Sequence, residues 1–322
     1  MNEDLLQINS LKTHFATTDG IVRAVDGVNL RIAASQAVGL VGESGSGKSM
    51  TALSIMRLVP PPGKILEGQV LLKGKDLLRL SEKEMRSIRG KEISMIFQDP
   101  MTYLNPVMKI GDQIAESLLV HQCDTKKQAM DDVAKLLERV QIHSPKETAN
   151  SYPHQLSGGM RQRVLIAIAI ACNPSLLIAD EPTTALDATL QVQILDLLKT
   201  LAAELKISVL LITHDLGIVA DICDFVNVMY AGRILECADV FSLFEDPKHP
   251  YTKGLLASAL SIDEFKEKLV TIDGIVPNLL ELPQGCKFHP RCQYATVRCR
   301  TDEPRLVDVG DGRMVACWLF GG

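Results

Sequence analysis

Residues 42–49 have the composition and spacing of a loop that binds the phosphates of a nucleotide. They read Gly-Glu-Ser-Gly-Ser-Gly-Lys-Ser and fit the pattern G-x-x-x-x-G-K-[ST]. Glycines let the backbone approach an anion closely, and successive N–H groups at a helix N-terminus face it. In such a loop Lys48 reaches the β- and γ-phosphates, and the hydroxyl of Ser49 binds Mg²⁺. The motif predicts binding of ATP or GTP. The predicted contacts are Gly42, Glu43, Ser44, Gly45, Ser46, Gly47, Lys48, Ser49 and Met50.

Polar groups also follow three predicted buried strands. Asp180 and Glu181 end the apolar run 176–179, where two carboxylates would be costly to bury without a cation. In a phosphate-loop ATPase the first acid binds Mg²⁺ through water, and the second can polarise the attacking water. Gln98 is placed to contact Mg²⁺ or a water, and His214 to donate to the γ-phosphate. Taken alone, Gln98 is equally compatible with a turn and His214 with a structural role.

A second glycine turn occurs more than a hundred residues after the phosphate loop. Ser157 is a favourable N-cap, and Gly158 and Gly159 leave the amides at the start of the next helix uncovered. Because residues 42–49 already supply one phosphate site, the second turn suggests a nucleotide shared between two copies of the cassette.

The elements that must position these groups are those of an α/β protein. Residues 37–41 are predicted to form a buried strand that leads through the glycine loop into a helix. Residues 5–41 alternate apolar and polar positions, which predicts antiparallel strands ahead of the loop. Residues 105–153 have a helical composition with no strand pattern, which indicates a helical insertion. Phe15 lies on a polar stretch, where its ring could stack on a base, although for this residue taken alone packing is the favoured interpretation.

Composition restricts the classes of protein. The 322 residues include 34 basic and 39 acidic ones, a net charge of −5 that provides no general basic field for nucleic acid. The N-terminal residues 1–4 lack the basic and apolar regions of a signal peptide. The most apolar run, residues 164–172, is shorter than the roughly 20 residues that span a bilayer. We therefore expect an intracellular protein, attached to a membrane only through partners.

Four of the eight cysteines are concentrated near the C-terminus. In such a chain, cysteines are expected to be reduced thiols or metal ligands rather than disulfides. The spacing matches neither the zinc C-x2-C pattern nor the ferredoxin runs, so a metal site and free thiols both remain open. His289 is a further candidate ligand. The four residues are Cys286, Cys292, Cys299 and Cys317.

Together these motifs resemble the nucleotide-binding subunits of ABC transporters. The family's order and spacing are matched by the phosphate loop, Gln98, Leu-Ser-Gly-Gly at 156–159, Asp180-Glu181, Ala-Leu-Asp at 185–187 and His214. The resemblance covers about residues 4–245. It implies an ABC-type P-loop ATPase core with an antiparallel β subdomain and a helical subdomain at about 105–160.

The resemblance also implies a role for each of these residues. Phe15 matches the aromatic residue that stacks on adenine, and Gln98 the Mg²⁺ and water contact that also senses the membrane subunits. Asp180 matches the Mg²⁺-linked acid, Glu181 the catalytic base and His214 the γ-phosphate switch. Lys48 and Ser49 match the contacts to phosphate and to Mg²⁺. Because no catalytic group of the family is missing, we expect ATP hydrolysis.

The turn at 157–159 matches the family's signature sequence. By resemblance Ser157, Gly158 and Gly159 close over ATP bound to the opposite subunit, and Asp187 lies at the same dimer seam. Met160 stands where many members carry Gln, and Phe15 where many carry Tyr. Neither departure removes a catalytic group.

The finer resemblance is to the peptide-importer branch, the oligopeptide, dipeptide and nickel permease ATPases. Residues 97–106, 152–160 and 249–252 are similar to that branch, as is a tail after residue 250 that most ABC subunits lack. The tail most resembles the dipeptide-type "D" subunit. The resemblance implies import of di- or oligopeptides, with nickel or another peptide-like solute as the alternative. It divides the chain into a nucleotide-binding domain, 1–245, and a small cysteine-rich C-terminal domain, 246–322.

The cysteine-rich tail of this branch is associated with a [4Fe–4S] cluster in some members, so the resemblance implies such a cluster at the four cysteines. Zinc or free thiols remain the alternatives.

The resemblance implies partners as well. They are a second, "F"-type ATPase subunit, two transmembrane permeases and an extracytoplasmic substrate-binding protein, with this chain on the cytoplasmic face of the inner membrane. The rival class is a soluble ABC ATPase acting on nucleic acid or ribosomes. Such proteins usually carry two cassettes or an insertion, and basic surfaces, whereas this chain has one cassette and an acidic balance. An ABC exporter ATPase is disfavoured by the tail, and we expect no nucleic-acid partner.

Overall fold

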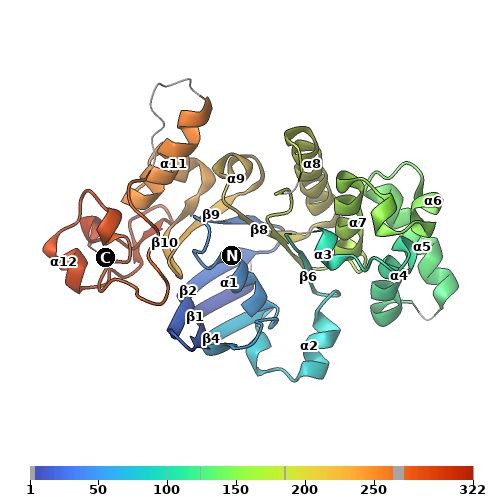
Figure 1. Cartoon of the computed structure of the whole chain (residues 1–322), viewed down its shortest axis with the longest axis horizontal. Helices are drawn as coiled ribbons and strands as arrows, with labels where there is room; N and C mark the ends of the chain where they lie inside the picture. Colours follow the sequence, from blue (N-terminus) through green and yellow to red (C-terminus); the bar gives the residue numbers. More distant parts are fainter. Residues whose placement is uncertain (1–3, 99, 124, 185, 264–271, 322) are drawn as a thin grey trace. The chain divides into compact units, whose positions relative to one another are not determined.

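The computed structural model divides the chain into two compact units. The first is built mainly of Arg79–Leu210, with residues 33–36 added to it. The second is built of Glu3–Ile32, Ala37–Leu78 and Leu211–Gly322. Figure 1 shows the helices and strands and labels many of them. The residues that the structure describes are 4–98, 100–123, 125–184, 186–263 and 272–321.

An antiparallel sheet opens the second unit, with strand order β2-β1-β4-β5. Its strands are β1 (Asp4–Thr17), β2 (Gly20–Ala33), β4 (Gly63–Leu72) and β5 (Lys75–Asp76). In β2 the side chains of Val28, Leu30 and Ile32 are buried, whereas Asn29 and Arg31 between them are exposed. This alternation has the period of a strand with one buried face. The antiparallel strands predicted ahead of the phosphate loop are confirmed.

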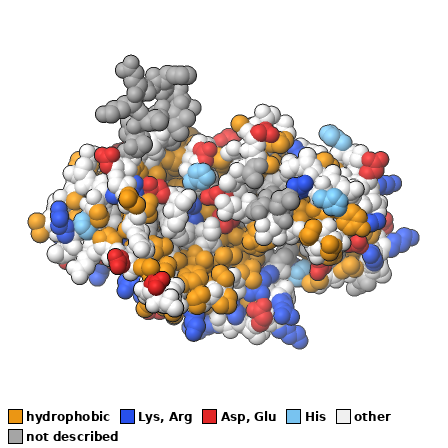
Figure 2. Space-filling model, viewed as in Figure 1, with side chains coloured by type: hydrophobic (Ala, Val, Ile, Leu, Met, Phe, Trp, Pro, Cys, Tyr) orange, Lys and Arg blue, Asp and Glu red, His pale blue; other side chains and the backbone are white. Residues whose placement is uncertain are grey.

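The surface over this sheet is partly apolar. Figure 2 shows hydrophobic side chains gathered over β1, β2 and β4. Ile21 of β2 and Leu66 of β4 are 57% and 55% exposed. Apolar atoms contribute a large share of the surface of any folded protein, so this observation by itself does not indicate a binding site.

The phosphate loop belongs to a second group of strands in the same unit, in the order β11-β12-β10-β9-β3. Strand β3 pairs in parallel with β9, and its Val38 and Leu40 are fully buried, as expected for a strand covered on both faces. The bounds are β3 (Ala37–Val41), β9 (Phe225–Tyr230), β10 (Arg233–Asp239), β11 (Val307–Asp308) and β12 (Met314–Val315). The helices of this unit are α1 (Lys48–Ile55), α9 (Leu216–Ile222), α10 (Val240–Glu245), α11 (Pro250–Asp263) and α12 (Val297–Thr301).

The first unit contains the parallel pair β6 (Ile93–Ile96) and β7 (Leu176–Asp180). Strand β8 (Ser208–Thr213) begins in this unit and ends in the second. All residues of β6 and β7 are buried. Because neighbouring parallel strands end at the same edge of a sheet, the polar residues that follow β6 and β7 are brought together.

Helices make up most of the first unit. They are α2 (Glu82–Ile88), α3 (Pro100–Tyr103), α4 (Ile110–His121), α5 (Lys126–Arg139), α6 (Pro145–Asn150), α7 (Gly158–Ile170) and α8 (Ala188–Leu205). The Thr125 side chain caps α5, and Ala129, Val133, Leu136 and Leu137 of that helix are buried at helical spacing. Helices α4, α5 and α6 pack on one another and share one core with α7 (Figure 1). The predicted helical insertion is confirmed.

The C-terminal segment does not form the separate cysteine-rich domain that we expected. Strand β12 pairs with β10 through Glu236↔Val315 and Cys237↔Met314. The described residues 272–321 therefore belong to the same compact unit as the phosphate loop. The reason is that a short segment buries its apolar residues, such as Phe288 and Val315, against the strands of that unit.

No helix in the described part of the chain is both long enough and apolar enough to cross a membrane.

Candidate nucleotide-binding site

The phosphate loop connects β3 to α1, as its sequence predicts. Gly42 and Gly47 have φ angles of 155° and 105°. A Cβ atom on Gly42 would lie 2.1 Å from the carbonyl oxygen of Met229, and one on Gly47 would lie 2.1 Å from that of Ala24. Both positions therefore require glycine for steric reasons as well as for backbone conformation.

Lys48 is only 5% exposed and lies across the loop. Its Nζ donates to the carbonyl oxygens of Gly42, at 2.7 Å, and Glu43, at 3.0 Å. Helix α1 begins beyond Gly47, which makes no side-chain capping bond. An ammonium group beside the uncapped amides of a helix N-terminus forms a site for an anion. This arrangement fits a polyphosphate.

In the first unit, the structure brings Gln98 and Glu181 together. The Nε2 atom of Gln98 donates to the Glu181 carboxylate at 2.9 Å, and Thr184 Oγ1 donates to the same carboxylate at 2.9 Å. Asp180 ends β7 and is 5% exposed. Glu181 has a φ of 46°, a left-handed conformation that is uncommon for residues with a side chain and concentrates at functional sites. The carboxylate is thus held in a defined orientation.

The signature turn lies at the start of α7. The Ser157 hydroxyl accepts a hydrogen bond from the amide of Met160 at 3.3 Å, as a helix N-cap does. Ser157 and Gly158 are exposed, whereas Gly159 is buried and a Cβ there would lie 3.1 Å from the Leu190 side chain. The turn therefore presents backbone amides and a hydroxyl at an exposed helix N-terminus.

Asp187 caps the next helix of the same unit. Its carboxylate accepts from the amide of Leu190 at 2.9 Å, and the residue is exposed. Helices α7 and α8 pack against each other, so Asp187 and the signature turn lie on neighbouring helices.

Phe15 and His214 lie in the second unit, together with the phosphate loop. Phe15 of β1 is half-buried and pairs with Gly63 of β4, where a Cβ would lie 2.5 Å from the ring. The glycine thus leaves room for the ring to rest on β4. His214 follows β8 directly and is exposed. The predicted residues are therefore divided between the two units, with Gln98, Asp180, Glu181, residues 157–159 and Asp187 in the first.

Two residues that contact the phosphate loop were missed by the sequence analysis. The hydroxyl of Tyr251 accepts from the amide of Glu43 at 2.9 Å. The guanidinium of Arg291 donates to both carboxylate oxygens of Glu43, at 2.7 and 3.0 Å. Both residues lie within segments that resemble the peptide-importer branch. No local pattern, however, connects them to a loop more than 200 residues earlier.

The four C-terminal cysteines line one cavity of about 160 Å³. All eight cysteines of the chain are free thiols. Burial raises the pKa of the Cys286 thiol to about 11 and also raises the pKa of Cys292 and Cys317. Among the described residues, no group of three or more His, Cys, Asp or Glu side chains is placed to hold a metal ion. The predicted iron–sulfur cluster therefore has no preformed group of metal ligands among the described residues.

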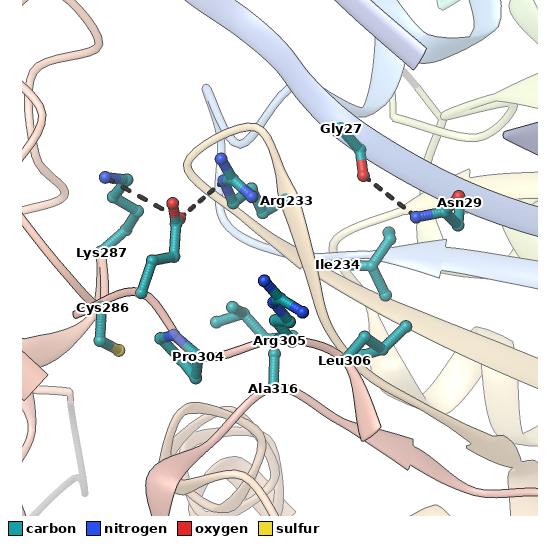
Figure 3. A pocket seen from close by; sticks show the side chains of 12 residues that line it. Gly27, Asn29, Arg233, Ile234, Cys286, Lys287, Pro304, Arg305, Leu306 and Ala316 are labelled. Carbon is teal, nitrogen blue, oxygen red and sulfur yellow. Dashed lines mark hydrogen bonds and ion pairs between the residues drawn. The ribbon is translucent and has the colours of Figure 1, made fainter. Parts of the chain in front are cut away.

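A larger cavity of about 470 Å³ lies elsewhere in the second unit (Figure 3). Three of its charged side chains, Arg233, Lys287 and Glu303, form ion pairs with one another. Glu303 lies 2.7 Å from Nε of Arg233 and 3.8 Å from Nζ of Lys287, and Arg233 also pairs with Asp26 at 2.9 Å. None of the predicted nucleotide contacts lines this cavity.

Comparisons with known proteins agree with this geometry. The family profile described as "ABC transporter" matches residues 25–184, and that described as "Oligopeptide/dipeptide transporter, C-terminal region" matches residues 235–299. The chain is 51% identical to the oligopeptide transport ATP-binding protein AppD of Bacillus subtilis, covering 98% of this chain and 97% of that protein. It is 47% identical to the dipeptide transport ATP-binding protein DppD of Escherichia coli, covering 97% and 96%.

Among solved structures, the chain is similar to the dimeric ATP-binding cassette MJ0796 in a post-hydrolysis state bound to ADP and Pi. The TM-score is 0.65 at 28% identity, covering 73% of this chain and 98% of that one. The cassette cbiO1 of Clostridium perfringens gives a TM-score of 0.64 at 28% identity, covering 76% and 92%.

The phosphate loop, the strand-end carboxylates and the cassette fold define a phosphate-loop ATPase of the ATP-binding-cassette type. The chain belongs to the ABC transporter family, in its branch of oligopeptide and dipeptide transport ATP-binding proteins. The resemblance found in the sequence is confirmed.

Proposed function

We propose that this chain is the ATP-hydrolysing subunit that energises import of di- and oligopeptides across the cytoplasmic membrane. The observation that carries the proposal is the match to peptide-transport ATP-binding proteins over nearly the whole chain. The match includes residues 235–299, which correspond to the C-terminal region of oligopeptide and dipeptide transporters. We retain 1–245 as the nucleotide-binding part and 246–322 as the extension that marks this branch.

In the proposed site, the second unit binds the nucleotide. Lys48 and the amides of the loop neutralise the β- and γ-phosphates, and Phe15 stacks on the base. Mg²⁺, held by the Ser49 hydroxyl and through water by Asp180, would stabilise the charge that develops on the transferred phosphoryl group. The buried ammonium of Lys48 supports this assignment, because its two carbonyl contacts fix it above the loop.

The first unit supplies the hydrolytic groups. Glu181 accepts a proton from the attacking water, and the hydrogen bonds from Gln98 and Thr184 hold its carboxylate in orientation. His214 of the second unit is proposed to donate to the γ-phosphate. The position of His214 supports this role, because the residue follows β8 directly and is exposed.

A second ATPase subunit completes each site. We propose that Ser157, Gly158 and Gly159, with Asp187 beside them, face ATP bound by the opposite subunit. The exposed N-terminus of α7 supports this, since its first amides and the Ser157 hydroxyl can donate to an anion. The partner subunit is proposed to be an "F"-type paralogue.

The remaining partners are two transmembrane permeases and an extracytoplasmic substrate-binding protein, which place this chain on the cytoplasmic face of the inner membrane. Import of nickel or another peptide-like solute is the alternative within the same machinery. A net charge of −5 argues against nucleic acid as the partner.

The test is a pull-down of tagged protein from gently solubilised native membranes, with untagged cells as the control and every partner identified by mass. Two polytopic permeases and a second ATPase support the proposal. The associated binding protein then decides between solutes, since calorimetry with dipeptides and with Ni²⁺ should give heat for only one. Recovery of soluble partners or nucleic acid alone would contradict an import function.

The cysteine cavity makes a separate prediction. The tail's resemblance predicts a [4Fe–4S] cluster held by Cys286, Cys292, Cys299 and Cys317. Its support is that all four side chains line one cavity. Protein purified without oxygen should then be brown and contain about four iron atoms and four acid-labile sulfides per chain. Colourless, iron-free protein from the same preparation would rule the cluster out.

A further inference from the structure

Glu43 places a negative charge within the phosphate loop itself. The loop must bind a polyphosphate, and a like charge nearby weakens the binding of an anion. In the structure, the Glu43 carboxylate forms a bidentate ion pair with Arg291, with N–O distances of 2.7 and 3.0 Å. Bidentate pairs between arginine and carboxylate are strong and fix geometry. Arg291 therefore neutralises Glu43 and also sets its direction.

Arg291 is itself firmly anchored. Its side chain is 4% exposed, and its guanidinium also donates to the carbonyl oxygens of Ile272, at 3.2 Å, and Asp273, at 3.0 Å. The guanidinium lies 5.9 and 6.0 Å from the ring centroids of Tyr230 and Phe288. The hydrogen bond to Glu43 is the main cause that raises the pKa of Arg291. An exposed ion pair on a protein surface contributes little to stability, but this pair is held by buried neighbours on the Arg291 side.

A second contact from the C-terminal half fixes the backbone at the same residue. The hydroxyl of Tyr251 accepts from the Glu43 amide at 2.9 Å. Tyr251 is fully buried, and its ring centroid lies 4.6 Å from that of Tyr230 and 5.3 Å from that of Phe288. The side chain and the amide of Glu43 are thus both held by residues beyond position 250.

Arg291 and Phe288 belong to one short segment, residues 286–292, which is bounded by two of the cysteines in the four-cysteine cavity. That segment therefore connects the cavity physically with the phosphate loop. Contacts within one compact unit carry the connection, because all of these residues lie in the second unit.

We propose that Arg291 is a positioning residue for the phosphate loop, and that nucleotide affinity depends through it on the segment 286–292. The inference rests on the proposed function only in that the chain binds ATP. Without Arg291, the negative charge of the Glu43 carboxylate is not compensated and repels the phosphates of ATP. The loop also loses a contact that fixes its conformation, and both effects weaken the binding of ATP.

The experiment measures the Kd of ATP, with Mg²⁺ chelated, for the full-length chain and its variants, together with KM, kcat and Tm. Arg291→Ala should raise Kd and KM on the order of tenfold, as expected for loss of a hydrogen-bonded charge partner. The value of kcat should stay within about twofold, because no group assigned to the hydrolytic step is removed. Arg291→Lys should be intermediate, since an ammonium cannot form the bidentate pair. Arg300→Ala removes an exposed arginine of helix α12 and is the matched control.

The decisive variant is Glu43→Gln in the Arg291→Ala background. Because it removes the uncompensated charge, it should bring Kd back to within about threefold of wild type, whereas a merely structural loss would not be repaired. An unchanged Kd in Arg291→Ala, or no recovery in the double variant, would overturn the proposal. If Arg291→Ala is insoluble, the same comparison is made with Arg291→Gln and Glu43→Gln/Arg291→Gln. Wild-type protein that fails to bind ATP would instead contradict the proposed function.

Discussion

At the scale of single residues, the proposed hydrolysis depends on how one carboxylate is held. Glu181 follows a buried strand in a left-handed conformation and accepts hydrogen bonds from Gln98 and Thr184. Such a conformation persists only where the surrounding contacts fix it. Asp180, one residue earlier, is buried at the strand end. The two adjacent acids therefore have different surroundings, which agrees with different roles for them.

The base assignment makes a prediction. Glu181→Gln keeps the size of the side chain but removes its ability to accept a proton, so kcat for ATP hydrolysis should fall by about 10²–10⁴-fold. The Kd of ATP should change little, and ATP should stabilise a dimer that size-exclusion chromatography detects. Glu204→Gln changes an exposed glutamate of α8 in the same way and serves as the control. Hydrolysis near the wild-type rate in Glu181→Gln would refute the assignment.

At the scale of elements, the helices of the first unit place the signature turn. Helix α7 shares its core with α4, α5 and α6. The position of the exposed turn at the N-terminus of α7 therefore depends on the packing of that core. Leu137 of α5 is fully buried within it. Packing therefore connects a residue far from any nucleotide contact to the geometry of the turn.

Leu137→Ala should lower the free energy of unfolding by about 2–5 kcal/mol, because it removes buried methyl groups and leaves a cavity. Urea denaturation followed by circular dichroism measures the loss. Glu138→Ala changes the next residue, which is exposed, and should lie within about 0.5 kcal/mol of wild type. Equal stabilities for the two variants would show that α5 does not contribute to a packed core.

At the scale of the whole chain, the C-terminal segment contributes to the stability of the unit that holds the phosphate loop. His249 is 1% exposed, and its Nδ1 accepts from the amide of Tyr251 at 3.0 Å. Burial lowers the pKa of His249 to about 3. The histidine is therefore neutral in the folded protein, where it supports the tyrosine that contacts Glu43.

This pKa predicts how stability depends on pH. Between about pH 6.5 and pH 3 the unfolded chain binds a proton at His249 that the folded chain does not, so this contribution to stability is present above pH 6.5 and is lost as the pH falls. From pH 7.5 to pH 5.0 the loss should be about 2 kcal/mol. Urea denaturation of wild type and His249→Gln at both pH values measures it. In His249→Gln, the fall in the free energy of unfolding between these pH values should be smaller by this amount. In His143→Gln, which changes an exposed histidine, the fall should be the same as in wild type. The same pH dependence in wild type and His249→Gln would contradict a buried neutral histidine.

Much of the site was predictable because its chemistry is encoded in short runs of sequence. The phosphate loop, Asp180-Glu181 and the signature turn each depend on neighbouring residues that fix a turn, a strand end or a helix cap. Hydrophobic periodicity likewise predicted the antiparallel strands and the helical insertion, since a period of two or of 3.6 residues is a local property. The pairing of Gln98 with Glu181 follows from two strand ends and the parallel arrangement of their strands.

The sequence by itself therefore determined the class of protein, and it predicted the nucleotide loop and the residues that we propose for hydrolysis. Only the tertiary structure decided what the C-terminal segment does. It joined β12 to β10 instead of forming a separate domain, and it brought Tyr251 and Arg291 to Glu43. The resemblance predicted a [4Fe–4S] cluster at the four C-terminal cysteines. The structure shows that they line one cavity, but it shows no preformed group of metal ligands among the described residues. The physical reason is separation along the chain, because contacts between residues more than 200 positions apart depend on how the whole unit packs and leave no local pattern.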